Sequence, residues 1–173
     1  IVEGYFDVIA AHKSNLCETV ATLGTALTDE HAQLCKRLAR RVILLLDADR
    51  AGQQATLKAS ATLLKHDLRV LIATLPKGED PDSLVRKKGG EALLGCIENC
   101  LPAITHALEQ FFPNKNLPIE QCMDGIEQIT PLLNALISPI ERELYINQIA
   151  ERLQIDHNRL LKLLNKSTRS SNL

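Results

Sequence analysis

The chain has 173 residues, of which 45% are hydrophobic and 24% are charged. This is the composition of a globular protein, long enough for one compact domain or for one domain with a small satellite. The formal net charge is -1, whereas most nucleic-acid-binding domains have a basic excess because neutralising phosphates supplies their affinity. If this chain acts on nucleic acid, another segment must supply most of the contacts, or its carboxylates must act through bound cations.

The five cysteines include no Cys-x-x-Cys pair and no zinc ligand set. We therefore expect small buried residues in a reducing compartment. We also expect no signal peptide and no membrane-spanning segment, and hence a cytoplasmic protein without a membrane partner. Because the chain begins at Ile1, without Met and inside an apolar run, we expect it to be a fragment.

The first hundred residues alternate between strand-like and helix-like segments. Residues 41–46 form a nearly continuous apolar run, as in a strand buried on both faces of a parallel sheet. Thr28 is a good N-cap for the helix that follows it. We predict strands at 1–4, 19–22, 41–46 and 69–75, and helices at 7–13, 29–40, 51–66 and 81–88. This order predicts an α/β fold with a mostly parallel sheet flanked by helices.

After residue 91 the pattern becomes helical and no further strand is predicted. The expected helices, separated by Pro and polar residues, are 91–99, 102–112, 119–136, 140–153 and 157–164. We therefore divide the chain into an α/β domain (1–100) with a truncated first strand, a helical bundle (101–166) and a flexible tail (167–173).

Carboxylates follow the predicted strands at three places. These acidic residues are Glu3 and Asp7, then Asp47 and Asp49, then Asp80 and Asp82 with Glu79 beside them. In an open α/β sheet the carboxyl ends of the parallel strands meet at one edge, where ligands bind. Each cluster alone is more often a loop or a helix cap, but three together favour a shared site.

A divalent cation would offset the repulsion among so many carboxylates. Hard oxygen ligands select Mg²⁺ or Mn²⁺ rather than zinc or copper. Such ions accept phosphate oxygens as further ligands, so the pattern indicates phosphoryl or nucleotidyl transfer.

Four motifs carry a more specific resemblance. Residues 3–8 (Glu-Gly-Tyr-Phe-Asp-Val) resemble the Glu-Gly-Tyr-x-Asp-Val signature of DnaG-type primases. Residues 47–52 (Asp-Ala-Asp-Arg-Ala-Gly) resemble the family's Asp-x-Asp-x-Ala-Gly signature, with Ala48 where Gly is frequent. Residues 22–25 (Thr-Leu-Gly-Thr) match a loop between these two, and residues 75–86 resemble the third motif.

The resemblance implies a Toprim-type α/β domain and DNA-templated synthesis of RNA primers for replication by metal-dependent nucleotidyl transfer. It implies that Glu3, Asp47 and Asp49 are catalytic. It also implies that the metals, Mg²⁺ or Mn²⁺, and the triphosphate are bound by Glu3, Asp7, Asp47, Asp49, Asp80 and Asp82.

The implied partners are a single-stranded DNA template, nucleoside triphosphates and a replicative helicase. In this family we expect helicase contact through a carboxy-terminal domain and zinc only in an amino-terminal domain, both absent from this chain, as is a basic subdomain of the polymerase core. We therefore expect the isolated chain to be weakly active or inactive.

Two alternatives stay open: another Toprim enzyme, such as a DNA-cleaving nuclease, or a non-catalytic module that binds a cation or a nucleotide. Lys77 and Arg86, near the third acidic cluster, are candidates for contact with the triphosphate or template, although a solvated face is at least as common for such charges. We expect Tyr5 to pack rather than to act in catalysis.

Overall fold

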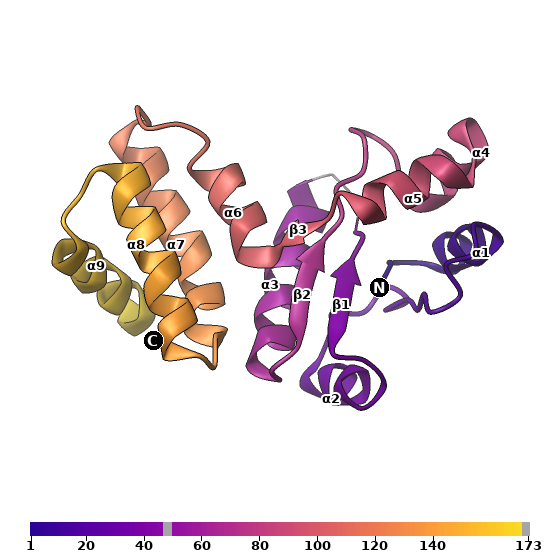
Figure 1. The fold of residues 1–173 in the computed structure, drawn as a ribbon, viewed down its shortest axis with the longest axis horizontal. Coiled ribbons are helices and arrows are strands. Elements are labelled where there is room, and N and C mark those ends of the chain that lie inside the picture. Colours follow the sequence, from indigo (N-terminus) through magenta and orange to yellow (C-terminus); the bar gives the residue numbers. More distant parts are fainter. Residues whose placement is uncertain (47–49, 171–173) are drawn as a thin grey trace. The chain divides into compact units, whose positions relative to one another are not determined.

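The computed structural model describes residues 1–46 and 50–170. The chain divides into two compact units, Ile1–Ala103 and Ile104–Leu173. The first is α/β and the second is helical (Figure 1). The division lies close to the predicted boundary near residue 101.

The sheet of the first unit has the strand order β1 (Arg41–Leu44), β2 (Arg69–Ile72) and β3 (Leu101–Pro102). Strands β1 and β2 are parallel, as predicted, and β3 runs antiparallel to β2. The sequence prediction misses β3, because two residues that include a proline give no alternating pattern.

The amino-terminal residues extend this sheet. The backbone N–H of Leu45 donates to the carbonyl of Ile1 (2.9 Å), and the N–H of Val2 donates to the carbonyl of Val20 (2.9 Å). Residues 1–3 therefore lie between β1 and the segment around Ala21, which forms an isolated parallel bridge with Val2. The predicted first strand is therefore present only as a short bridge beside β1. Glu3 directly follows this bridge.

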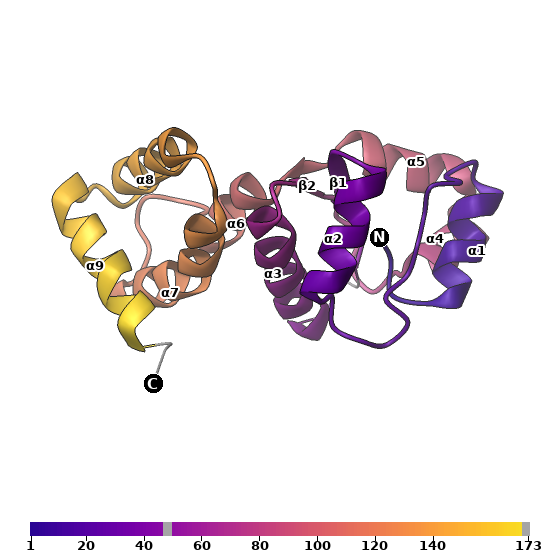
Figure 2. The same cartoon turned by 90° about the horizontal axis from the view of Figure 1, so that it is seen from below.

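Helices flank the sheet in two groups (Figures 1 and 2). Helices α2 (Asp29–Leu38) and α3 (Arg50–Lys65) pack together, and α3 also packs on β2. Helices α1 (Tyr5–Lys13), α4 (Pro81–Lys88) and α5 (Gly90–Glu98) form the other group. Buried side chains beneath this second group are Val2, Ala11, Leu45, Ala73, Leu75, Leu84 and Leu93. Burial of this apolar surface fixes α1 and α4, which carry acidic residues, against the sheet.

The second unit consists of α6 (Ala103–Phe111), which starts at the boundary, α7 (Ile119–Ala135), α8 (Pro139–Leu153) and α9 (His157–Ser170). Its fully buried side chains include Phe112, Ile126, Ile129, Leu133, Ile146 and Ile149. The Arg152 guanidinium donates to the carbonyls of Leu108 (3.2 Å) and Phe112 (3.1 Å). These hydrogen bonds tie α8 to the end of α6, where the Leu108 carbonyl also accepts from the backbone N–H of Phe112 (2.9 Å).

Helix α9 continues to Ser170, beyond residue 166, where we predicted the helical bundle to end and a tail to begin. Neither Gly nor Pro occurs after residue 156, so nothing in the sequence stops the helix once its apolar face is buried. Nowhere in residues 1–46 and 50–170 is there a helix with both the length and the apolar character needed to cross a membrane.

Candidate active-site cleft

The first unit contains a cleft of about 800 Å³. Its walls come from α1, the loop at residues 22–27, the end of β1, α3 and the start of α4. The carboxylates among the lining residues are Glu3, Asp7, Asp80 and Asp82. The structure thus brings the first and third predicted acidic clusters together. Asp47 and Asp49, the second cluster, lie outside the described residues.

Asp7 is held at the amino-terminal end of α1. The backbone N–H of Gly4, the N-cap residue, donates to Oδ2 of Asp7 at 2.9 Å. The Asp7 side chain is therefore fixed by a hydrogen bond at the start of its own helix. This agrees with the possibility, raised for each acidic cluster alone, that its carboxylate caps a helix. It is nevertheless only 8% exposed, which is unusual for a carboxylate.

Burial raises the pKa of the Asp7 carboxyl above its ordinary value. Hydrogen bonds from the backbone amides of Gly4 and Asp82 oppose this effect, and the nearby carboxylates of Asp80 and Glu3 raise the pKa further. The ionised form of Asp7 is thus disfavoured both by loss of water and by like charges. A cation in the cleft would reverse that balance.

Asp80 and Asp82 reach the cleft from the first turn of α4. Asp80 is the N-cap: its Oδ1 accepts a hydrogen bond from the N–H of Ser83 (2.6 Å), and its own N–H donates to Oγ of Ser83 (3.0 Å). Pro81 occupies the first helical position, where its missing N–H costs nothing. The Asp-Pro-Asp sequence is therefore both a helix start and a source of two carboxylates in the cleft.

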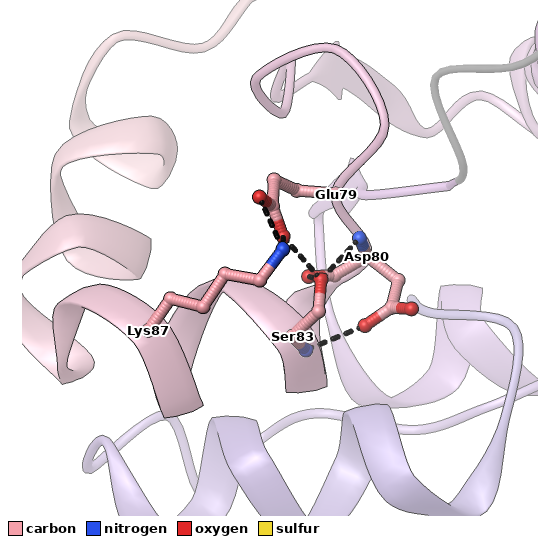
Figure 3. Close-up of polar contacts among 4 residues, drawn as sticks. All are labelled: Glu79, Asp80, Ser83 and Lys87. Atoms are coloured by element: carbon pink, nitrogen blue, oxygen red, sulfur yellow. Dashed lines mark hydrogen bonds and ion pairs between the residues drawn. The ribbon is translucent and has the colours of Figure 1, made fainter.

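Glu79 does not line the cleft, although it directly precedes Asp80. Its carboxylate accepts from Nζ of Lys87 (2.8 and 3.0 Å) and from Oγ of Ser83 (2.6 Å), as Figure 3 shows. These two contacts lower the pKa of Glu79, the Lys87 contact more strongly. Glu79 therefore ties the loop to α4, and its charge is balanced locally.

Neither of the two predicted cationic residues lines the cleft. Lys77 is exposed. The Arg86 side chain, 72% exposed, has its Nε 3.0 Å from Oδ2 of Asp82, one turn earlier on α4. Contact between Arg86 and a ligand would therefore compete with this ion pair.

Several lining residues were not predicted as site residues, among them Lys58, Tyr5 and Phe6. Lys58 lies on α3, one turn after Gln54, which also lines the cleft; the four-residue spacing was the available signal. Tyr5 and Phe6 line the cleft as well and are 70% and 74% exposed. The expectation that Tyr5 packs is therefore wrong, because the buried face of α1 is formed by Asp7, Ala10 and Ala11 instead.

The four cleft carboxylates do not by themselves form a ligand set. Within the part of the chain that the structure describes, no group of three or more His, Cys, Asp or Glu side chains is placed to hold a metal ion. The donor type suits Mg²⁺ or Mn²⁺, so the predicted metal set depends on Asp47 and Asp49 and stays a prediction.

Comparisons with known proteins agree in both units. Residues 1–85 match a family model described as "Toprim-like", and residues 106–158 match one described as "DnaB-helicase binding domain of primase". The second match corrects our expectation that the family's helicase-binding region is absent from this chain. A helical pattern records which face is buried but not which partner it meets, so the sequence pattern alone did not reveal it.

The chain is similar throughout to bacterial primases. It is 36% identical over 172 residues to a DNA primase of Clostridium acetobutylicum, covering 99% of this chain and 29% of that protein. It resembles the structure of the zinc-binding and RNA polymerase domains of the Aquifex aeolicus primase (TM-score 0.78, 27% identity, 93% of this chain and 38% of that chain). It also resembles a DnaG primase catalytic domain solved bound to single-stranded DNA (TM-score 0.73, 32% identity, 91% and 52%). The chain therefore spans under a third of the length of the curated relative.

Proposed function

Because the chain belongs to the family of bacterial DnaG-type primases, we propose that it forms the metal-binding part of an enzyme that synthesises short RNA primers on single-stranded DNA. One observation carries the proposal: carboxylates from two separate parts of the chain line one cleft in a chain whose whole length is similar to DNA primases. A nuclease or a purely structural module does not account for similarity over the whole chain.

In the proposed reaction, the 3′-hydroxyl of the growing primer attacks the α-phosphate of a nucleoside triphosphate, and pyrophosphate leaves. Bound Mg²⁺ or Mn²⁺ would stabilise charge on the attacking and leaving oxygens. Glu3, Asp7, Asp80 and Asp82, with Asp47 and Asp49, are the proposed ligands, and Glu3, Asp47 and Asp49 the catalytic residues. The pKa of Asp7 is raised mainly by burial and further by the nearby carboxylates of Asp80 and Glu3. A bound cation would offset both effects, which supports this assignment.

The proposal assigns most template contact to parts of the enzyme outside this chain. The net charge of -1 supplies little attraction for the DNA backbone. We therefore expect the 173 residues alone to support little or no primer synthesis, and the complete enzyme to support it.

The test is incorporation of labelled ribonucleotides on a single-stranded DNA template with Mg²⁺ or Mn²⁺, comparing the complete enzyme with its Asp7→Asn variant. The proposal expects template-dependent RNA products from the parent. It expects a loss of at least about a hundredfold in the variant, comparable to the loss of one positioned group that stabilises charge in the transition state. Cleavage of the DNA without nucleotide would instead favour the nuclease alternative. Binding of nucleotide without any RNA product would favour the non-catalytic one.

A second proposal concerns the helical unit, which we infer to contact the replicative helicase. It is supported by the match of residues 106–158 to a helicase-binding family and by exposed apolar side chains at the turn into α8. Ile137, Ile140 and Leu144 are 59%, 75% and 59% exposed. Residues 140 and 144 are one helical turn apart and share a face, and exposed apolar patches of this kind mark protein contacts.

The matched test uses two double variants in a helicase-binding assay. Ile140→Ser/Leu144→Ser is expected to weaken binding, whereas Ile119→Ser/Met123→Ser, at exposed positions at the start of α7, is expected to leave it unchanged. Equal binding by the parent and both variants would remove the turn into α8 as the contact.

A further inference from the structure

One wall of the cleft is not explained by metal binding. Helix α3 contributes Gln54, Ala55, Lys58 and Ala59 to the lining. Their spacing places them on one helix face, with Lys58 one turn beyond Gln54. Among the lining residues that the structure describes, Lys58 is the single lysine or arginine, set against four carboxylates.

Lys58 differs from Lys36 and Lys87 of this unit in having no carboxylate partner among the described residues. The ammonium of Lys36 lies 2.7 Å from Asp67, and that of Lys87 lies 2.8 Å from Glu79. The Lys58 side chain is exposed to the cleft and forms no such ion pair with them. Within the described residues, no carboxylate neutralises the charge of Lys58.

We propose that Lys58 binds a phosphate of the nucleoside triphosphate in this cleft, a role that rests on the proposed function. A polyphosphate is repelled by the carboxylates that line the same space, so each phosphate needs a cationic partner. Metal ions can neutralise the phosphates that lie close to the carboxylates. A lysine can neutralise a phosphate that lies farther from them, because its ammonium acts as a point charge.

Lys58 lies well inside α3. It is eight residues after Arg50, where the helix begins, which is about 12 Å along the helix axis at about 1.5 Å per residue. The proposed phosphate contact therefore comes from the body of α3 and not from its first turn.

The size of the cleft favours a nucleotide over a nucleic-acid strand. Its volume of about 800 Å³ falls in the range of roughly 300–1,000 Å³ typical of small-molecule sites. A single strand is usually held in an open groove lined by several cations and stacking aromatics. Tyr5 and Phe6 could stack with bases, but one lysine among four carboxylates does not supply the several cations of such a groove.

The experiment is calorimetric titration of the complete protein, in Mn²⁺, with ATP, inorganic tripolyphosphate, adenosine and a single-stranded oligodeoxynucleotide. Three variants are compared with the parent: Lys58→Ala, Lys58→Arg and Lys65→Ala. Lys65 is an exposed lysine in the last turn of the same helix and does not line the cleft. It therefore controls for loss of a positive charge on α3.

Lys58→Ala is expected to weaken ATP and tripolyphosphate binding about tenfold or more, the value of one charge-assisted hydrogen bond. Binding of adenosine and of Mn²⁺ alone should not change. Lys58→Arg should retain most of the affinity for ATP, and Lys65→Ala all of it.

Three results for Lys58→Ala would overturn the assignment while leaving the proposed function intact. The variant could bind ATP as tightly as the parent, or it could lose affinity only for the oligodeoxynucleotide. It could also lose as much affinity for Mn²⁺ as for ATP. If the parent itself binds no ATP with Mn²⁺, the proposed function and the role of Lys58 fail together.

Discussion

Gly125, inside α7, provides a sharp test of the packing in the helical unit. Gly125 is buried, and a Cβ added there would lie 2.8 Å from Cε1 and 2.9 Å from Cζ of Phe112, and 3.1 Å from Cβ of Phe111. Carbon atoms prefer separations of about 3.5–4.0 Å. The ring of Phe112 is only 1% exposed, so it has no free space into which to move.

We predict that Gly125→Ala destabilises the protein. Helix propensity alone favours alanine by about 1 kcal/mol, whereas overpacking a buried site costs about 1–3 kcal/mol. The expected net loss is therefore about 1 kcal/mol, or roughly 4–8 °C in Tm for a domain of 60–100 residues.

The control is Gly95→Ala in α5. No atom lies within 4 Å of a Cβ added at Gly95, so only helix propensity acts and a gain of about 0.5–1 kcal/mol is expected. Urea unfolding followed by circular dichroism measures both variants against the parent. A gain in stability for Gly125→Ala equal to that of Gly95→Ala would refute the close approach of Phe112.

Three further predictions concern the first unit. Because the folded state raises the pKa of Asp7, it binds this proton more tightly than the unfolded state, so the parent loses stability as pH rises above the ordinary pKa of about 4. The Asp7→Asn variant has no such carboxyl group and does not lose this stability. In urea unfolding, its free energy of unfolding relative to the parent should therefore increase from about pH 4 to about pH 7. A stability difference that does not change with pH would contradict this prediction. Asp80→Ala removes the cap on Ser83 N–H and should cost about 1 kcal/mol, whereas Asp80→Asn keeps the cap and should cost less; equal losses in urea unfolding would argue against capping. Phe6→Ser, at a side chain 74% exposed, should change the free energy of unfolding by no more than about 0.5 kcal/mol. A larger change in this free energy, measured by thermal unfolding, would mean that Phe6 is packed.

Local chemistry made much of the fold predictable. Thr28 accepts a hydrogen bond from the N–H of His31 at the start of α2, and Asp80 with Pro81 begins α4, both as expected. The parallel pairing of β1 with β2 follows from a helix between two apolar strands. Caps, prolines and apolar runs act over a few residues, so one sequence is enough to recognise them.

Features that depend on distant contacts were not predictable in the same way. Strand β3 is defined by the antiparallel pairing of Leu101 and Pro102 with β2, and no local sequence pattern encodes that pairing. Tyr5 was expected to pack, yet it is exposed and lines the cleft. Lys58 stands 55 residues after Glu3 in the sequence, and only the folded chain places both in one cleft.

Binding of Mn²⁺, measured by calorimetry, tests the metal-dependent mechanism most directly. The parent is compared with Asp7→Asn and with the Asp47→Ala/Asp49→Ala double variant, each checked for folding by circular dichroism. We predict saturable binding by the parent, weakened by Asp7→Asn and lost in the double variant. Equal Mn²⁺ binding by all three proteins would contradict a metal-dependent mechanism in this cleft. So would the absence of Mn²⁺ binding by the complete parent enzyme.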